Sequence, residues 1–201
     1  MLVKLSDNFQ KLLKENLIGL CYNPEFIALG SVVKDMLNPD FILIGAYSKK
    51  SEEKLAEIYQ VVNGKDIAIK AMSIISAEIT KISINTFLTL KISYANTIGL
   101  LCNEFDSANK FDVCEAIGSD SRIGNKFLLP GLGFGGPCLP RDNRAFAHFA
   151  KAVGLEYNLG YVTDGFNNEH AKSVCDYWDT MNSHKLPYYF EYITYKRNLI
   201  D

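Results

Sequence analysis

The chain has 201 residues, a hydrophobic fraction of 48% against 22% charged residues, and a formal net charge of -2 at pH 7. This length can form one domain with a sizeable core or two smaller lobes, and the composition excludes a disordered chain. The weak negative charge argues against nucleic-acid binding, which usually requires a basic surface. We therefore expect a small molecule or another protein as the partner.

The cysteine pattern indicates a reducing compartment. The five cysteines form no C-x-x-C pair, and the N-terminal segment MLVKLSDNFQKLLKEN lacks the build of a signal peptide. These cysteines are Cys21, Cys102, Cys114, Cys138 and Cys175. An odd number of separated thiols is typical of a cytoplasmic protein. Polar residues interrupt each apolar stretch before it reaches the roughly 18 residues of a membrane span, so we expect no membrane association.

The first 75 residues alternate between helical and strand patterns. The segments DNFQKLLKEN and SKKSEEKLAEIYQVV have helical patterns, whereas LIGLCYN and FILIGAY are short apolar runs. Apolar runs of this length between helical segments are typical of buried parallel strands. The pattern predicts a piece of an α/β layer whose sheet is cut short on its N-terminal side.

From Ser76 onward the patterns are helical. Residues 76–105 contain no proline and one glycine, and their apolar residues cover most faces, which predicts one long, mostly buried helix. A shorter helix is expected to end at Gly118, another to begin with Asp142 or Asn143 as its N-cap, and a third to cover about 165–180. The tyrosine-rich segment 181–201 indicates no particular structure. Its aromatic residues are expected to pack on the body or form a subunit contact rather than to bind bases.

The segment GLGFGGPCLPRDN, residues 131–143, places Cys138 between a glycine run and the start of a helix. Glycines let a backbone pass close to a ligand. The positive end of a helix, together with Arg141, favours the thiolate form of a nearby cysteine. The segment therefore fits a nucleophilic cysteine, and it fits equally an incidental cysteine in a glycine-rich loop.

Two patterns resemble binding sites without the required context. Residues 131–136 have the G-x-G-x-x-G spacing of a dinucleotide site, but Pro130 and Pro137 occupy the places of the preceding strand and the following helix. The histidines and a nearby cysteine lack the spacing of known metal-ligand pairs, so we expect no metal. These residues are His148, His170, His184 and Cys175.

Lys81 and Asn85 form a polar pair within the long helical segment. They are four residues apart and therefore share a helix face, while their neighbours are apolar. A buried ammonium or amide needs a partner. The pair either faces a wet site or lies on a simply solvated face.

Five segments, in order and at their present separations, carry a resemblance to a known family. They are NPEF at 23–26, GSVVKDMLNPD, AEITKISINTFLTLKIS, DSRIGNKFL and GFGGPCLPRD. Over about residues 15–170 the chain resembles the nucleotide-sugar dehydrogenases of the UDP-glucose/GDP-mannose dehydrogenase family. The resemblance implies an α/β fragment, the end of a Rossmann-like parallel sheet, at 1–75. It implies a mainly α-helical central domain at 76–180, which forms a homodimer through the long helix 76–105.

Members of this family oxidise the 6-hydroxymethyl group of a UDP- or GDP-linked sugar to a carboxylate with NAD, through a thiohemiacetal and a thioester on a cysteine. The resemblance implies that Cys138 is this nucleophile. It also implies that Lys81, with Asn85 beside it, stabilises oxyanions. Asp142 resembles the aspartate that positions water, and Glu25 resembles the glutamate of thioester hydrolysis.

The resemblance also indicates binding residues and two departures from the family pattern. Arg122 resembles an arginine that reaches the substrate across a dimer interface, and Phe134 and Gly135 occupy the loop that lines the sugar pocket. Arg141 is the candidate for cofactor binding, at a position where lysine is usual. Leu29 replaces a glutamate of many relatives, so a second carboxylate near the pocket is absent.

No segment before Asn23 resembles the strand and G-x-G-x-x-G turn that bind NAD in this family. Two hypotheses remain open. In the first, the chain is an incomplete nucleotide-sugar dehydrogenase whose cofactor domain lies on a separate polypeptide or outside the given sequence. In the second, it is a catalytically silent helical remnant that serves dimerisation or another interaction.

The missing turn leads to a prediction about activity. We expect that the chain alone neither binds NAD tightly nor reduces it with a UDP- or GDP-sugar, because the turn supplies the pyrophosphate site. A displacement of the nicotinamide by about 1 Å would itself cost on the order of a hundredfold in rate. NADH absorbance after mixing chain, NAD and nucleotide sugar measures this. Robust NADH formation that Cys138→Ala abolishes would contradict the expectation.

Overall fold

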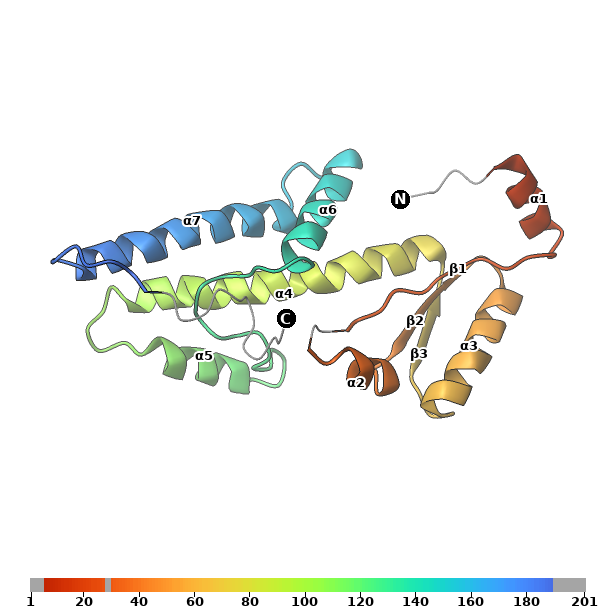
Figure 1. Ribbon diagram of the computed structural model, residues 1–201, viewed down its shortest axis with the longest axis horizontal. Helices are drawn as coiled ribbons and strands as arrows, with labels where there is room; N and C mark the ends of the chain where they lie inside the picture. The colour runs from red at the N-terminus through yellow and green to blue at the C-terminus, as the bar shows by residue number, and fades with distance from the viewer. Residues whose placement is uncertain (1–5, 28–29, 190–201) are drawn as a thin grey trace. The chain divides into compact units, whose positions relative to one another are not determined.

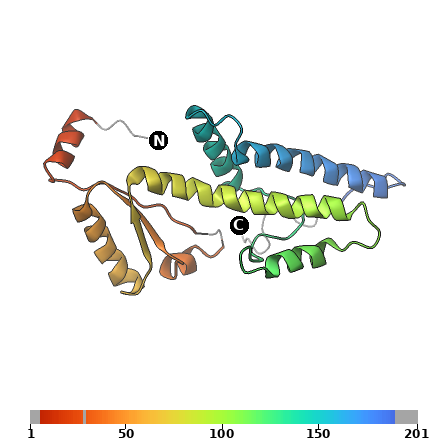
Figure 2. The same ribbon diagram turned by 180° about the vertical axis from the view of Figure 1, so that it is seen from behind.

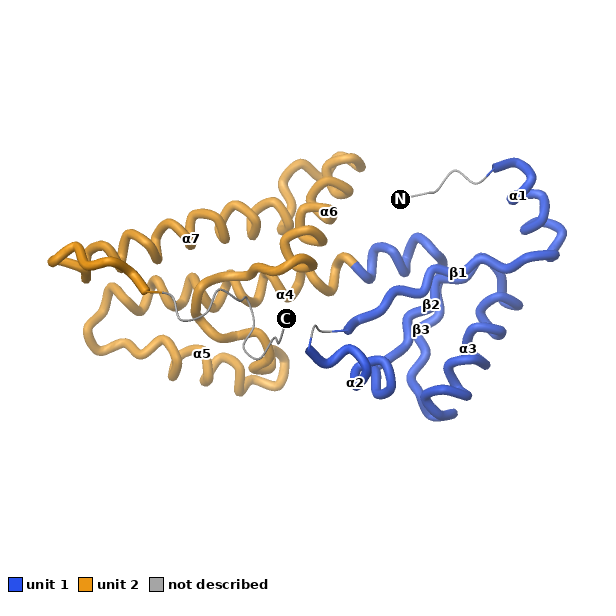
Figure 3. Tube along the Cα trace, viewed as in Figure 1, with its two compact units in different colours: residues 1–81, 196–201 blue, residues 82–195 orange. Residues whose placement is uncertain are grey.

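The computed structural model describes residues 6–27 and 30–189. The described chain forms two compact units, coloured separately in Figure 3. The long helix α4 (Ile74–Cys102) contributes to both, because unit 1 ends at Lys81 and unit 2 begins at Ile82. A small sheet lies in unit 1 and helices make up unit 2 (Figure 1). The predicted fold class is confirmed, whereas the domain boundary expected after residue 75 stays a prediction.

The sheet of unit 1 has the order β1-β2-β3 among the described residues. The strands are β1 (Cys21–Tyr22), β2 (Ile42–Ala46) and β3 (Ile69–Met72). β2 confirms the strand expected in FILIGAY, and it is parallel to β3, a strand that the sequence analysis did not identify, with Ile42 opposite Ile69. β1 is antiparallel to β2, with Cys21 opposite Ala46, so the prediction of a parallel strand in LIGLCYN is wrong. The prediction failed because an apolar run indicates that a strand is buried but not in which direction it runs. Pro24, which has no N–H to donate to a sheet, lies two residues after β1.

Among the described helices of unit 1, α3 (Lys49–Asn63) packs on β2, the buried strand. The others are α1 (Asp7–Lys14) and α2 (Val32–Leu37), and α1 and α3 confirm the sequence prediction. Ser48 caps α3 by accepting the N–H of Ser51, and Figure 2 shows α3 beside the sheet. Gly45 of β2 lies against the start of α4, where a Cβ would come within 2.7 Å of the Ala77 Cβ. The absence of a side chain at Gly45 thus lets α4 begin directly on the sheet.

Helices account for the regular structure of unit 2 in the described residues. They are the remainder of α4, α5 (Lys110–Ser119), α6 (Leu139–Ala152) and α7 (Leu159–Met181). α4 confirms the helix expected over 76–105, and α5 ends one residue after Gly118. α7 begins earlier than about residue 165, because Asn158 caps it by accepting the N–H of Tyr161.

The start of α6 corrects the sequence analysis. Its N-cap is Cys138, not Asp142 or Asn143. Pro140 lies in the first turn, where its missing N–H costs no hydrogen bond. Asp142 and Asn143 are only 5% and 0% exposed. The capping rule failed here because these side chains bond to neighbouring helices instead of to the N–H groups of α6.

Burial along α4 also differs from the expectation of a mostly buried apolar helix. The most deeply buried positions of α4 in unit 2 carry small or polar side chains: Thr86, Thr89, Ser93, Ala95, Asn96 and Cys102. The large side chains of Phe87, Tyr94 and Leu101 are instead 60%, 49% and 57% exposed. The inner face of α4 is therefore partly polar, and a row of large apolar groups lies on its surface.

The chain turns back after α7. The Asn182 carboxamide bonds both the N–H and the carbonyl of Leu186, and the Tyr188 hydroxyl donates to Asp179 at 2.7 Å. The rest of the tyrosine-rich segment, from residue 190, lies outside the described residues. Within residues 6–27 and 30–189, no helix combines the length and apolar character needed to cross a bilayer.

Candidate functional site

Cys138 is exposed and lies directly at the start of α6. Its side chain makes no capping hydrogen bond, and it is a free thiol. The first N–H groups of a helix carry the positive end of its dipole. The fold therefore presents this thiol to solvent at a helix N-terminus, as the sequence predicted.

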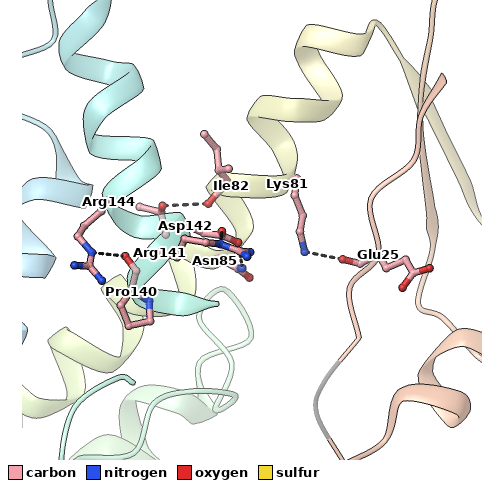
Figure 4. Close-up of polar contacts among 9 residues, drawn as sticks. Glu25, Lys81, Ile82, Asn85, Pro140, Arg141, Asp142 and Arg144 are labelled. Atoms are coloured by element: carbon pink, nitrogen blue, oxygen red, sulfur yellow. Dashed lines mark hydrogen bonds and ion pairs between the residues drawn. The ribbon is translucent and has the colours of Figure 1, made fainter. Parts of the chain in front are cut away.

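Asp142 lies one turn after Cys138, whose carbonyl accepts the Asp142 N–H at 2.9 Å. The Asp142 carboxylate is buried between two donors, shown in Figure 4. The amide of Asn85 donates to one oxygen at 2.6 Å, and the Nε of Arg141 donates to the other at 2.8 Å. Such donors compensate a buried carboxylate for lost water, and the carboxylate raises the pKa of Arg141. Asn85 thereby joins α4 to the helix that begins at Cys138.

Asn143 fixes the same turn of α6 from its other side. Its amide donates to the Gly160 carbonyl at 2.8 Å. The hydroxyls of Thr89 and Thr163 lie 2.9 and 3.2 Å from its carboxamide oxygen. Because these groups belong to α4 and α7, one buried side chain of α6 contacts both neighbouring helices.

The glycine-rich loop places Phe134 and Gly135 before Cys138. Phe134 is buried, at 6% exposure, and Gly135 is half-buried. The N–H and the carbonyl of Phe134 both bond the carboxamide of Asn167 on α7, at 2.8 and 3.0 Å. The loop is therefore attached to the helical body and is not a free flap.

In unit 1, Lys81 contacts the NPEF segment. Its Nζ donates to the Glu25 carbonyl at 2.6 Å and lies 4.6 Å from the centre of the Phe26 ring. A carbonyl and an aromatic face are both favourable partners for an ammonium group, so the partner expected for Lys81 is present. The Glu25 side chain is exposed, and Figure 4 shows its carboxylate turned away from Lys81.

Asn23 anchors the NPEF segment to unit 1. Its amide donates to the Leu43 carbonyl of β2 at 2.8 Å, and the Tyr59 hydroxyl of α3 donates to its carboxamide oxygen. Phe26 packs on Phe41 with ring centres 5.1 Å apart. Leu29, which departs from the family pattern, lies outside the described residues.

Arg122 lies after α5 and presents its guanidinium at the surface, with 86% of the side chain exposed. It bonds both carboxylate oxygens of Asp120, the shortest contact being 2.6 Å. This hydrogen bond keeps the pKa of Asp120 below its usual value. Exposed pairs of this kind are weak, so Arg122 could exchange Asp120 for another anion at little cost.

The sequence analysis missed a set of carboxamide and imidazole side chains that support this region. They are Asn96, Asn143, Asn167 and His170. The sequence indicated no metal site and no other partner for His170, and its Nε2 lies 2.7 Å from the Gly131 carbonyl. Across the described ranges, no group of three or more His, Cys, Asp or Glu residues could hold a metal ion. The available sequence signal was a polar residue recurring on an otherwise apolar helix face.

Comparisons with known proteins match most of the chain to one family. Residues 75–169 match the UDP-glucose/GDP-mannose dehydrogenase family, central domain, and residues 2–63 match the NAD binding domain of the same family. The chain belongs to the UDP-glucose/GDP-mannose dehydrogenase family. The match begins at residue 2, earlier than the expected start near residue 15.

Similar proteins include UDP-glucose 6-dehydrogenase AglM of Haloferax volcanii, 42% identical over 79% of this chain and 37% of the relative. UDP-glucose 6-dehydrogenase TuaD of Bacillus subtilis is 38% identical over 68% of this chain and 29% of the relative. The solved UDP-glucose dehydrogenase of Pyrobaculum islandicum has a TM-score of 0.71 at 34% identity, over 83% of this chain and 37% of that one. The chain thus spans about a third of the length of these relatives.

In this family member, the turns that follow β2 and β3 do not fit the pyrophosphate of NAD. That group needs free N–H groups in a glycine-rich turn between a strand and a helix. Between β2 and α3, and between β3 and α4, the turns contain no glycine, and Ser48 and Ser73 already accept helical N–H groups there. The G-x-G-x-x-G spacing at 131–136 follows no strand. We therefore assign no NAD-binding step to these residues.

We predict that Cys138 is the most reactive of the five thiols. Burial raises the pKa of Cys21 and of Cys114, with further contributions from Glu52 and Cys102, respectively. Cys102 is itself buried, which leaves Cys175 as the exposed competitor. Limiting alkylation of the folded chain, read by mass spectrometry, should label Cys138 first. Preferential labelling of any other cysteine would contradict the prediction.

Proposed function

We propose that the chain supplies the thiol side of a nucleotide-sugar 6-dehydrogenase, which oxidises the sugar of a UDP- or GDP-linked substrate at C6 to a carboxylate. One observation carries the proposal: an exposed Cys138 starts α6, and one turn later a buried Asp142 is bonded by Asn85. In the sequence, these residues resemble the positions of the family's catalytic residues. Relatives that are 42% and 38% identical are UDP-glucose 6-dehydrogenases.

Two steps at the sugar carbon need only side chains and water. In the first, the Cys138 thiolate adds to the C6 aldehyde, so that a C–S bond forms and the former carbonyl oxygen becomes an alkoxide that takes up a proton. In the second, water adds to the thioester carbonyl, the C–S bond breaks, and the thiolate leaves. Lys81 and Asn85 stabilise the oxyanions, while Asp142 and Glu25 orient water or remove its proton.

The remaining candidates bind the reactants. Phe134 and Gly135 line the sugar pocket, and the exposed Arg122 exchanges Asp120 for the substrate of a partner subunit. The two hydride losses of the reaction, from the C6 alcohol and from the thiohemiacetal, would need NAD as the acceptor. Because the turns after β2 and β3 do not fit its pyrophosphate, the assignment of Arg141 to cofactor contact stays a prediction from the resemblance. All five cysteines are free, which supports a cytoplasmic setting, since the reaction requires a reduced Cys138.

Thiohemiacetal formation tests this proposal without NAD. The chain is incubated with the 6-aldehyde of UDP-glucose or of GDP-mannose and then alkylated, with Cys175 as the internal reference. The nucleotide-linked aldehyde should protect Cys138 several-fold more than Cys175, because only Cys138 lies in the sugar site. Glucose 6-aldehyde without a nucleotide should protect both thiols alike. Equal protection of both thiols by every aldehyde would favour the silent remnant over the enzyme.

A dimer through α4 is the second part of the proposal. Phe87, Tyr94 and Leu101 follow one another at seven-residue intervals and are about half exposed. This spacing places them in one stripe along the helix, and a stripe of large exposed apolar groups is typical of a subunit interface. A partner subunit would also provide the site that Arg122 reaches.

We predict that the chain sediments as a dimer at micromolar concentration and that Phe87→Glu shifts it to monomers, because the charge would be buried in the interface. Val61→Glu is the control, since Val61 is 86% exposed and belongs to α3, a different helix from the one that carries the stripe. Val61→Glu should leave the dimer intact. A folded wild-type monomer at these concentrations would exclude this interface.

A further inference from the structure

The glycine-rich loop before Cys138 is bonded to α7 at two points, and neither contact has been assigned a part in the reaction. The first point is Phe134. Asn167 accepts its N–H at 2.8 Å and donates to its carbonyl at 3.0 Å. A single carboxamide therefore replaces the paired bonds that a neighbouring strand would make, and it fixes both the position and the orientation of this peptide unit.

Gly133 shows how closely α7 approaches the loop. Its φ of +90° favours glycine, and a Cβ there would lie 2.5 Å from the Asn167 carboxamide oxygen and 3.7 Å from the His170 ring. The glycine is thus required both by the backbone conformation and by the Asn167 side chain. The loop and α7 are complementary at this point.

The second point is Gly131. Its carbonyl lies 2.7 Å from the Nε2 of His170, and its N–H donates to Asn96 of α4 at 2.7 Å. A carbonyl can only accept, so His170 carries its proton on Nε2. The ring is 5% exposed and stacks on Phe166 with an interplanar angle of 9°. In this orientation the buried imidazole donates to the loop.

Cys138 lies between this attachment and the fixed start of α6. On one side Asn167 and His170 bond residues 131–134, and on the other Asn143 fixes the first turn of α6. The segment between them, residues 135–138, is too short to move independently of both ends. The thiol itself makes no capping bond, so its place depends on these two attachments.

We propose that Asn167 and His170 are positioning residues, which set the location of the Cys138 thiol through the loop 131–137 without touching the substrate. The inference deepens the proposed function and rests on it for its catalytic meaning. It also gives a reason for the buried position of His170.

The test compares alkylation rates of Cys138 and Cys175 within the same folded molecules at pH 7. Asn167→Ala and His170→Leu should lower the Cys138/Cys175 ratio about fivefold, because each removes hydrogen bonds of ordinary strength from the loop. Asn168→Ala is the matched control, since Asn168 is the exposed neighbour on α7. His170→Gln should restore the ratio, because its amide can donate where Nε2 did.

Circular dichroism and thermal melting identify variants that fail to fold. If Asn167→Ala fails to fold, Asn167→Asp is tested in its place. Its carboxylate still accepts the Phe134 N–H but cannot donate to the Phe134 carbonyl, so the Cys138/Cys175 ratio should again fall. An unchanged ratio in folded Asn167 and His170→Leu variants would overturn the proposal. If the Cys138/Cys175 ratio fell as far in His170→Gln as in His170→Leu, the hydrogen bond from residue 170 would have no role in positioning the thiol.

The two proposals fail in different ways. Absence of aldehyde protection in the wild-type chain, with the Cys138/Cys175 ratio still sensitive to Asn167, would contradict the proposed function and leave a positioned thiol without that substrate. Normal aldehyde protection with an insensitive ratio would overturn the positioning role and leave the proposed function intact.

Discussion

The Asn143 carboxamide has no exposed surface, and it belongs to α6 while its partners belong to α4 and α7. Removing an amide from water costs several kcal/mol unless its hydrogen bonds are replaced, so α6 can dock only where Thr89, Thr163 and the Gly160 carbonyl supply them. Apolar contacts alone would permit many rotations of α6. The carboxamide selects one of them, and that rotation places Cys138 at the surface with Asp142 turned inward.

The same principle extends along the inner side of unit 2. Asp142 bonds Asn85, Gly131 bonds Asn96, and Phe134 bonds Asn167, so each segment around the thiol is located by a directional contact. The apolar cluster of Ala95, Cys114 and Leu128 joins α4 to α5 and to the loop that follows α5. In unit 2, apolar packing therefore holds α5, whereas buried polar groups hold the segments that carry the candidate catalytic residues.

The sequence predicted the helices of this chain better than it predicted which side chains they bury. The long apolar pattern of α4 and the charged pattern of α3 were sufficient for their positions. The direction of β1 was not predictable from LIGLCYN, because a run of apolar residues is equally compatible with a parallel and with an antiparallel strand. Asp142 and Asn143 matched a capping pattern, but their side chains form hydrogen bonds with α4 and α7 instead.

The candidate site was predictable only in part for a related reason. Cys138, Asp142 and Asn85 could be identified because a family pattern places them in sequence. Asn167 and His170 act on the loop from more than thirty residues away in the chain, and nothing local to them indicates that contact. Partners of that kind become visible only when the fold brings α7 against the loop.

Equilibrium unfolding in urea of Asn143→Leu tests most directly whether the buried carboxamide fixes unit 2, with the exposed Asn103→Leu as the control. Leucine has a similar size but leaves the Gly160 carbonyl and the hydroxyls of Thr89 and Thr163 without this partner. We expect the free energy of unfolding to fall by about 3 kcal/mol in Asn143→Leu. A change within about 0.5 kcal/mol, equal to that of a neutral surface substitution, would contradict the account.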